Sequence, residues 1–85
     1  MPTIDIYTQP FCGYCHRATR LLDQKGAAYN EIEVLEAPER KEEMIKRANG
    51  ARTTPQIFIG DTHVGGCDDL FALERAGKLD ALLNA

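Results

Sequence analysis

Hydrophobic and polar positions divide the chain into segments that alternate and segments that repeat at helical spacing. Residues 3–7 alternate and are rich in strand-forming residues, and residues 29–35 carry apolar side chains at alternate positions, so both are predicted strands. Between them, residues 13–25 repeat apolar and small residues at helical spacing, and Gly26 is a natural end for that helix. A strand–helix–strand unit of this kind predicts two parallel neighbouring strands.

The rest of the chain continues with further helices and strands. Gly60 and Asp61 separate two short strand patterns, which predicts a tight turn and an antiparallel hairpin. The expected segments are a helix over residues 36–49, strands over 56–59 and 62–64, a helix over 68–76 and a short helix over 79–83. The order β-α-β-α-β-β-α predicts an α/β fold in one domain, residues 1–85, with a mixed four-stranded sheet and helices on both faces.

Composition and charge exclude several classes of protein. The 10 basic and 13 acidic residues give a net charge of −3 and are mixed along the chain, so neither nucleic acid nor a membrane is an expected partner. The longest apolar runs fall far short of the roughly 18 residues that a membrane span needs. The amino terminus lacks the charged and apolar regions of a secretory signal.

The three cysteines, Cys12, Cys15 and Cys67, point to redox chemistry in a reducing compartment. An odd number argues against the disulfide framework of a small secreted protein. A Cys-x-x-Cys pair in a chain without a signal fits a compartment where disulfides are transient and catalytic, so a cytoplasmic location is expected. Cys67 is expected to be a small buried hydrophobe, with an oxidisable regulatory thiol as the alternative.

The Cys-Gly-Tyr-Cys motif falls where a predicted strand ends and a helix begins, and this placement separates the roles of its cysteines. A cysteine reacts as its thiolate, and its ordinary pKa of about 8.5 leaves little thiolate at neutral pH. The N–H groups and partial positive charge at a helix start favour a thiolate at Cys12. Cys12 is therefore the predicted exposed nucleophile, and Cys15, three residues further on, is the more buried resolving thiol.

Two other uses of the cysteine pair fit the sequence less well. A structural zinc site normally takes four ligands from two clusters, and only Cys67, His16 and His63 remain as further donors. Two buried, inert cysteines would be expected on an apolar face and not beside Pro10 and Gly13. The pattern and its context therefore favour a redox-active disulfide, with no metal site in the monomer.

Three segments carry a family resemblance. They are Tyr-Thr-Gln-Pro-Phe-Cys-Gly-Tyr-Cys at residues 7–15, Arg-Thr-Thr-Pro-Gln-Ile-Phe-Ile-Gly at 52–60 and Gly-Gly-Cys-Asp-Asp-Leu at 65–70. Together and in this order they resemble the signature segments of the dithiol glutaredoxins, and the likeness covers essentially the whole chain. The resemblance implies a thioredoxin-type fold, a cis peptide bond before Pro55 and glutathione as the reductant.

The resemblance also implies a glutathione site beside the cysteine motif. The backbone N–H and C=O of Thr54 would pair with the cysteinyl part of glutathione like a short strand. Gly65 and Gly66 allow a ligand close to the backbone, and the helix start after them suits the γ-glutamyl carboxylate. That carboxylate would bind the N–H groups of Cys67 and Asp68, with the ammonium by the Asp68 side chain. The glutathione-binding residues expected in this way are Gln9, Tyr14, Arg52, Thr54, Pro55, Gly66, Cys67 and Asp68, with Gln56 as a further donor.

The activity that the resemblance implies is that of a monomeric, glutathione-dependent thiol–disulfide oxidoreductase. Cys12 would take glutathione from a glutathionylated protein, and a second glutathione would release it. For a disulfide-bonded protein, Cys15 would resolve the mixed disulfide formed on Cys12. The expected partners are glutathione and such proteins. A thioredoxin that works without glutathione is an alternative hypothesis. Arg52 and residues 65–69 argue against it.

Gly13 departs from the common family pattern, which has proline at this position. Some family members without that proline hold a [2Fe–2S] cluster between two subunits, with two cysteines and two glutathione sulfurs as ligands. A glutathione-ligated [2Fe–2S] dimer with Cys12 as protein ligand, acting as carrier or sensor, is therefore the alternative function. Gln9 stands for a common lysine and Thr54 for a common valine, and little effect of Thr54 is expected because its contacts are through the backbone.

Overall fold

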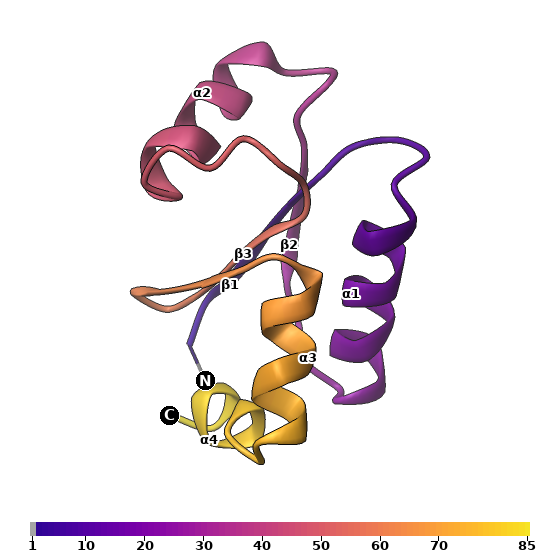
Figure 1. Cartoon of the computed structure of the whole chain (residues 1–85), viewed down its shortest axis with the longest axis vertical. Coiled ribbons are helices and arrows are strands. Elements are labelled where there is room, and N and C mark those ends of the chain that lie inside the picture. The colour runs from indigo at the N-terminus through magenta and orange to yellow at the C-terminus, as the bar shows by residue number, and fades with distance from the viewer. Residues whose placement is uncertain (1) are drawn as a thin grey trace.

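The structure, a computed structural model, describes residues 2–85, whose helices and strands follow the predicted order (Figure 1). The elements are β1 (Ile4–Thr8), α1 (Gly13–Gln24), β2 (Asn30–Glu33), α2 (Pro38–Arg47), β3 (Gln56–Ile59), β4 (Thr62–Gly65), α3 (Cys67–Arg75) and α4 (Leu79–Leu83). None of these helices combines the length and the apolar character that crossing a membrane would require.

The four strands form one mixed sheet in the order β2-β1-β3-β4, as the sequence predicts. β1 and β2 are parallel, with Thr8 opposite Glu33. β3 runs antiparallel to β1 and forms a hairpin with β4. Because β1 and β3 are neighbours, Tyr7 near the end of β1 lies opposite Gln56 at the start of β3. The loop after β1 and the loop before β3 therefore meet at one end of the sheet.

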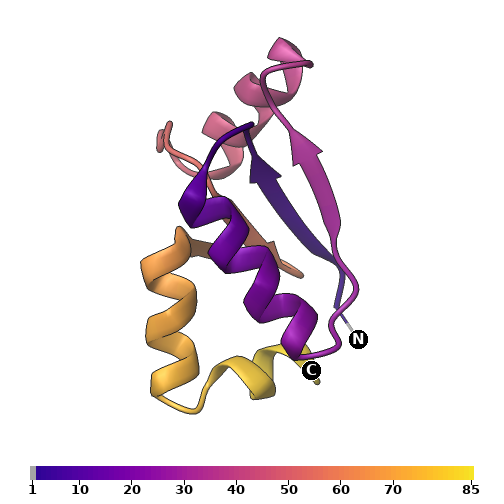
Figure 2. The ribbon, with the colours of Figure 1, turned by 90° about the vertical axis from the view of Figure 1, so that its right-hand side faces the viewer.

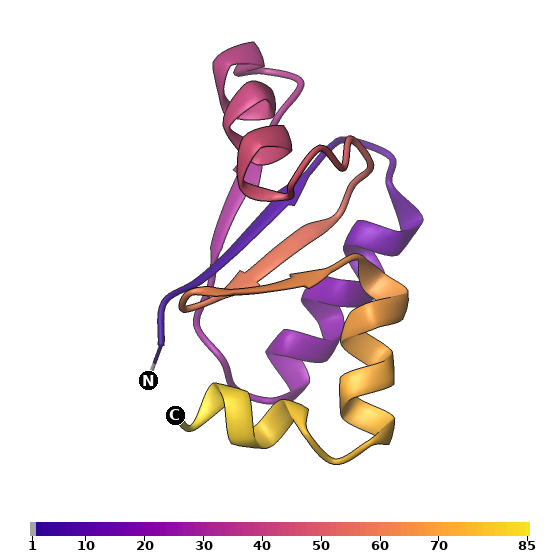
Figure 3. The ribbon, with the colours of Figure 1, turned by 60° about the vertical axis from the view of Figure 1, so that its left-hand side comes forward.

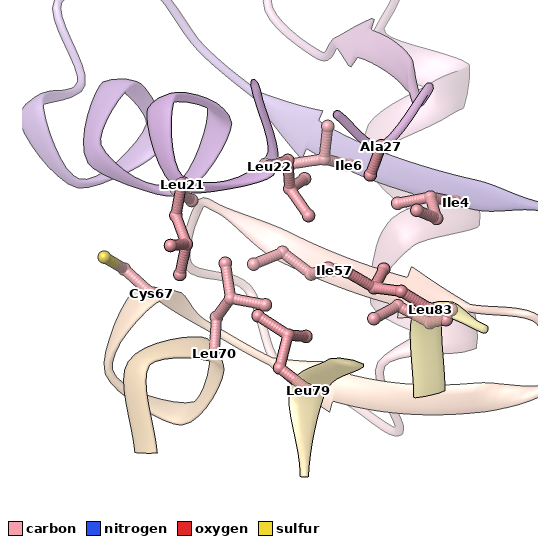
Figure 4. Packing of buried hydrophobic residues seen from close by; sticks show 12 residues of the cluster. Ile4, Ile6, Leu21, Leu22, Ala27, Ile57, Cys67, Leu70, Leu79 and Leu83 are labelled. Carbon is pink, nitrogen blue, oxygen red and sulfur yellow. The ribbon is translucent and has the colours of Figure 1, made fainter. Parts of the chain in front are cut away.

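Helices cover both faces of the sheet, which confirms that prediction. Figures 2 and 3 show α1 and α3 on one face and α2 on the other, with α4 below α1 and α3. The first face buries the larger apolar cluster, to which β1, α1, β3, α3 and α4 all contribute. Figure 4 shows its side chains, among them Ile6, Leu22, Ile57, Leu70 and Leu79.

The second face is smaller and is closed by polar groups at its rim. Tyr7, Met44 and Phe58 are buried between the sheet and α2. The Tyr7 hydroxyl donates to the Glu43 carboxylate and accepts a hydrogen bond of 2.8 Å from Arg47, whose guanidinium lies 4.1 Å from the centre of the Phe58 ring. Burial, together with the hydrogen bond to Glu43, raises the pKa of Tyr7, so its hydroxyl stays a donor at neutral pH. These contacts hold α2 against β1 and β3.

The end of β2 and the start of α2 differ from the prediction. β2 ends at Glu33 instead of residue 35, because the Glu33 carboxylate accepts hydrogen bonds from the N–H groups of Leu35 and Glu36 and turns the chain. α2 begins at Pro38 instead of residue 36, since proline suits the first helical position, where an N–H has no partner within the helix.

Candidate active site

Cys12 lies in the connection between β1 and α1, and its sulfur caps the helix. Its backbone is extended (φ −100°, ψ 102°), and its Sγ accepts a hydrogen bond of 3.1 Å from the Cys15 N–H. The first N–H groups of a helix have no partner within the helix, so a side chain at this position satisfies one of them. After reduction, a thiolate at Cys12 would receive the same hydrogen bond, which stabilises the charged form.

Cys12 and Cys15 are joined by a disulfide, with their Cα atoms 5.2 Å apart. Cys12 is half-buried, whereas Cys15 is only 4% exposed and faces the core. The prediction that Cys12 is the more accessible cysteine is therefore confirmed. An incoming thiolate or disulfide reaches the Cys12 sulfur before that of Cys15.

The loop before β3 brings Thr54 next to Cys12, 42 residues away in the sequence. The Thr54–Pro55 peptide bond is cis, as the family resemblance implies. The Thr54 hydroxyl oxygen and carbonyl oxygen each lie 3.8 Å from the Cys12 sulfur. The sequence-based expectation covered only the backbone of Thr54, so the hydroxyl that donates toward the sulfur is an additional contact.

A groove of about 570 Å³ opens beside this loop and runs to the start of α3; we call it the Pro55 groove. Its lining includes seven residues that the sequence assigned to glutathione, namely Tyr14, Thr54, Pro55, Gln56, Gly66, Cys67 and Asp68. Gln9 lines a second groove, which is described below. Arg52 is exposed and, within residues 2–85, is not part of the lining of either groove. The fold thus gathers most of the predicted set in one place, while the binding role of each residue stays a prediction.

The start of α3 presents N–H groups to the Pro55 groove. α3 begins at Cys67, one residue earlier than predicted. The Gly66 N–H donates to the Asp69 carboxylate at 2.9 Å, so Asp69 is the aspartate that caps this helix. The N–H groups of Cys67 and Asp68 lie in the first turn, and the Asp68 side chain is exposed. This arrangement suits a ligand carboxylate with an ammonium group beside it.

The Cys67 side chain belongs to the core. It is 4% exposed and packs in the larger apolar cluster (Figure 4). Burial raises the pKa of the Cys67 thiol, and the nearby Arg17 opposes this shift only in part. Cys67 is therefore a neutral thiol at neutral pH and has the surroundings of a small buried hydrophobe.

Gln56 and His63 form a support for the Thr54 loop that the sequence did not predict. Gln56 is 3% exposed, and its amide nitrogen donates to the Thr53 carbonyl at 3.0 Å and to the Thr53 hydroxyl at 3.2 Å. Its amide oxygen is then left to accept from the His63 Nε2 at 2.7 Å, so the His63 proton lies on Nε2. The Gln56 amide is thus engaged within the protein instead of donating to a ligand. The sequence did carry one signal of this inward position, since Gln56 is a polar residue at the start of an otherwise apolar predicted strand.

A second groove, of about 650 Å³, borders the active site on the β2 side; we call it the Phe11 groove. Phe11 itself is fully exposed and has a left-handed backbone (φ 59°), although it is not a glycine. The lining residues are Thr8, Gln9, Phe11, Cys12, Gly13, Cys15, His16, Thr19 and Glu31. His16 lies at an exposed position of α1. Both cysteines therefore border a groove in addition to the one predicted for glutathione.

Replacing Gly13 by proline should stabilise the reduced protein by about 0.4–1 kcal/mol, because proline restricts the unfolded chain. Gly13 is the first residue of α1, a Cβ there meets nothing within 4 Å, and Cys12 before it is already extended. Thermal unfolding of the reduced variant should show a higher Tm than wild type. Gly13→Ala is the matched control for loss of glycine alone, and a lower Tm for Gly13→Pro would contradict the prediction.

Replacing His63 by phenylalanine should lower the free energy of unfolding by about 0.5–1.5 kcal/mol, because the part-buried hydrogen bond between His63 and the Gln56 oxygen is lost. The new ring keeps the stacking on Phe58, from which the His63 ring centre lies 4.8 Å away. Urea unfolding measures the change. Thr62→Val, at an exposed neighbouring position of β4, is the control. Equal free energies of unfolding for the two variants would show that the hydrogen bond from His63 to Gln56 does not stabilise the protein.

Comparison with known proteins agrees with this geometry. The sequence model of the Glutaredoxin family matches residues 4–64. A glutaredoxin of Pseudomonas aeruginosa is 58% identical over 85 residues, which is 100% of both chains. The solution structure of glutaredoxin from Brucella melitensis is 58% identical with a TM-score of 0.84, covering 98% of this chain and 89% of that one.

A further solved structure is that of a buckwheat glutaredoxin–glutathione complex, which is 35% identical with a TM-score of 0.88. The match covers 98% of this chain and 77% of the buckwheat chain. The thioredoxin-type fold is therefore shared with these structures. The family match over most of the chain, and the disulfide at the start of α1, establish that this protein belongs to the glutaredoxin family of thiol oxidoreductases, with a dithiol active site.

Proposed function

We propose that this protein is a glutathione-dependent oxidoreductase that reduces protein–glutathione mixed disulfides and protein disulfides. The observation that carries the proposal is the Pro55 groove, which joins the Thr54 loop beside Cys12 to the start of α3. A related protein from buckwheat is described in complex with glutathione. A reducing compartment such as the cytoplasm, where glutathione keeps thiols reduced, is the proposed setting, and a monomer is the proposed working form.

The Pro55 groove offers partners to the γ-glutamyl and cysteinyl parts of glutathione. The γ-glutamyl carboxylate would accept from the N–H groups of Cys67 and Asp68, and its ammonium would lie at the exposed Asp68 carboxylate. The cysteinyl part would pair with the Thr54 backbone, and Tyr14 would flank its sulfur. Arg52 and Gln9 lie outside this lining, so their proposed contacts with the glycyl carboxylate would need their side chains to reach in from its edge.

The reaction on a glutathionylated protein needs only Cys12. The Cys12 thiolate attacks the glutathione sulfur, the bond to the protein sulfur breaks, and the protein leaves as a thiolate that takes a proton from water. The thiolate of a second glutathione then attacks the glutathione sulfur bound to Cys12. The bond between that sulfur and Cys12 breaks, oxidised glutathione leaves, and the released Cys12 thiolate is stabilised by the hydrogen bond from the Cys15 N–H.

A protein disulfide needs both cysteines. Cys12 attacks one of its sulfurs and forms a mixed disulfide, and the Cys15 thiolate then attacks Cys12, releasing the reduced protein and closing the Cys12–Cys15 disulfide. Two molecules of glutathione reduce that disulfide. Glutaredoxin potentials of about −200 to −230 mV lie close to the glutathione pool, so this last step is feasible.

Substitution of each cysteine tests these roles. Cys12→Ser should abolish both activities, because a serine hydroxyl does not replace the thiolate nucleophile. Cys15→Ser should keep the release of glutathione from a glutathionylated peptide but lose reduction of a protein disulfide. An assay with glutathione as the only reductant measures both. Substantial glutathione release by Cys12→Ser would refute the assignment, and failure of glutathione to reduce the wild-type disulfide would revive a thioredoxin-like function.

The glutathione-ligated [2Fe–2S] dimer remains the second candidate, because Gly13 leaves open space beside a partly exposed Cys12. Cys12 would be the ligand that each subunit supplies. Anaerobic purification with iron, sulfide and glutathione should then give a brown dimer with visible absorbance, and Cys12→Ser should be colourless. A colourless wild-type monomer under the same conditions would refute this candidate.

A further inference from the structure

The Phe11 groove and the Pro55 groove lie over opposite halves of the sheet, with the cysteine motif between them. Glu31 of β2, at one edge of the sheet, lines the Phe11 groove. His63 and Gly65 of β4, at the other edge, line the Pro55 groove. Cys12 follows β1 in the middle. The proposed glutathione site lies mainly on one side of the nucleophile, so the Phe11 groove has no assigned role beyond the proposed reach of Gln9 toward glutathione.

Exposed apolar side chains gather at this end of the molecule. Within residues 2–85, the large hydrophobic side chains that are exposed are Phe11, Tyr14 and Leu35. Phe11 and Tyr14 flank Cys12, and Leu35 follows β2 at the end of the sheet where β1 also ends. Phe11 and Tyr14 therefore leave apolar surface in water on either side of Cys12, which a bound molecule would cover.

The backbone of Phe11 strengthens this interpretation. A bulky residue with a left-handed backbone is unfavourable by about 1–2 kcal/mol, and such conformations cluster at functional sites. Burial of the ring does not explain the conformation, because the side chain is fully exposed. The conformation instead holds the ring in solvent at the mouth of the groove, next to Cys12.

The charge of the Phe11 groove indicates the chemistry of what it binds. Glu31 supplies the carboxylate among its lining residues, and the Thr8 hydroxyl donates to that carboxylate at 2.9 Å and holds it in place. A neighbouring lysine or arginine is one of the features that stabilise the thiolate of a protein cysteine and make it reactive. Such thiols are also the better leaving groups in disulfide exchange. The polypeptide around a target cysteine therefore tends to carry the charge that Glu31 complements.

We propose that the Phe11 groove binds the polypeptide half of a protein–glutathione mixed disulfide, with Glu31 selecting basic residues beside the target cysteine. This inference rests on the proposed function, in which the Pro55 groove holds the glutathione half. Cys12 attacks the glutathione sulfur in line with the sulfur–sulfur bond that breaks, so the target sulfur leaves as a thiolate on the far side of the glutathione sulfur, while the residues next to the target cysteine reach the Phe11 groove. Phe11 supplies apolar contact area that does not depend on the charge of the polypeptide.

The test compares two synthetic peptides that differ at one position. Each carries one glutathionylated cysteine, flanked by lysine in one peptide and by glutamate in the other. With glutathione as reductant at low salt, wild type should show a kcat/KM about two- to fivefold higher for the lysine peptide, the range expected of an exposed ion pair. Added salt of about 0.5 M should remove the preference.

Substitutions of Glu31 and Phe11 test whether the preference for the lysine peptide arises in the Phe11 groove. Glu31→Gln should bring the ratio of the two kcat/KM values close to one, and Glu31→Lys should invert it. Glu42→Gln makes the same charge change at an exposed position of α2 and should keep the wild-type ratio. Phe11→Ser should lower kcat/KM for both peptides and leave their ratio unchanged. Because each ratio compares two substrates of one variant, a general loss of activity does not alter it.

The outcomes separate this inference from the proposed function. If wild type releases glutathione from both peptides with equal kcat/KM, or if Glu31→Gln keeps the wild-type ratio, the docking role of the Phe11 groove is wrong while the proposed function stands. If wild type releases glutathione from neither peptide, nor from the mixed disulfide of glutathione and cysteine, the proposed function itself fails.

Discussion

The hydrogen bond from the Cys15 N–H to the Cys12 sulfur is the interaction on which the rest of the active site depends. It exists because β1 ends and α1 begins at the cysteine motif, so that an N–H without a helical partner faces the sulfur. The sheet then sets β3 beside β1 and brings the Thr54 hydroxyl within 3.8 Å of the same sulfur. A thiol that must react as a thiolate needs such donors, and the start of one helix and one distant loop supply them.

Cys12 follows the central strand β1 and lines the Phe11 groove, while the Pro55 groove reaches it through Thr54, whose hydroxyl lies 3.8 Å from the Cys12 sulfur. β1 has β2 on one side and the β3–β4 hairpin on the other, and each side contributes one groove. A disulfide substrate also has two halves, joined at the sulfurs. In disulfide exchange the attacking, central and leaving sulfurs lie in line, so grooves that fix both halves of the substrate would hold that line toward Cys12, which is how positioning lowers the barrier of such a reaction.

Hydrogen bonds within the fold hold the loops of the active site in place. Gln56 is buried but fully hydrogen-bonded, to Thr53 in the loop and to His63 on β4, so its burial is tolerated and the Thr54 loop is tied to two strands. On the opposite face, the contacts of Tyr7 with α2 fix the strand from which Cys12 follows. Loops that carry reactive groups commonly rely on a rigid scaffold of this kind.

The sequence by itself determined the elements, their order and the unequal exposure of the two cysteines, because periodicity and the placement of a motif at a strand–helix junction are local properties. It misplaced the turn after β2, since one side chain, that of Glu33, ends the strand there. Only the tertiary structure decided that the Thr54 hydroxyl reaches Cys12, that Gln56 turns inward and that Gln9 lines the second groove. Those contacts join residues far apart in the chain, and the direction of a side chain across such a distance depends on packing that no local pattern encodes.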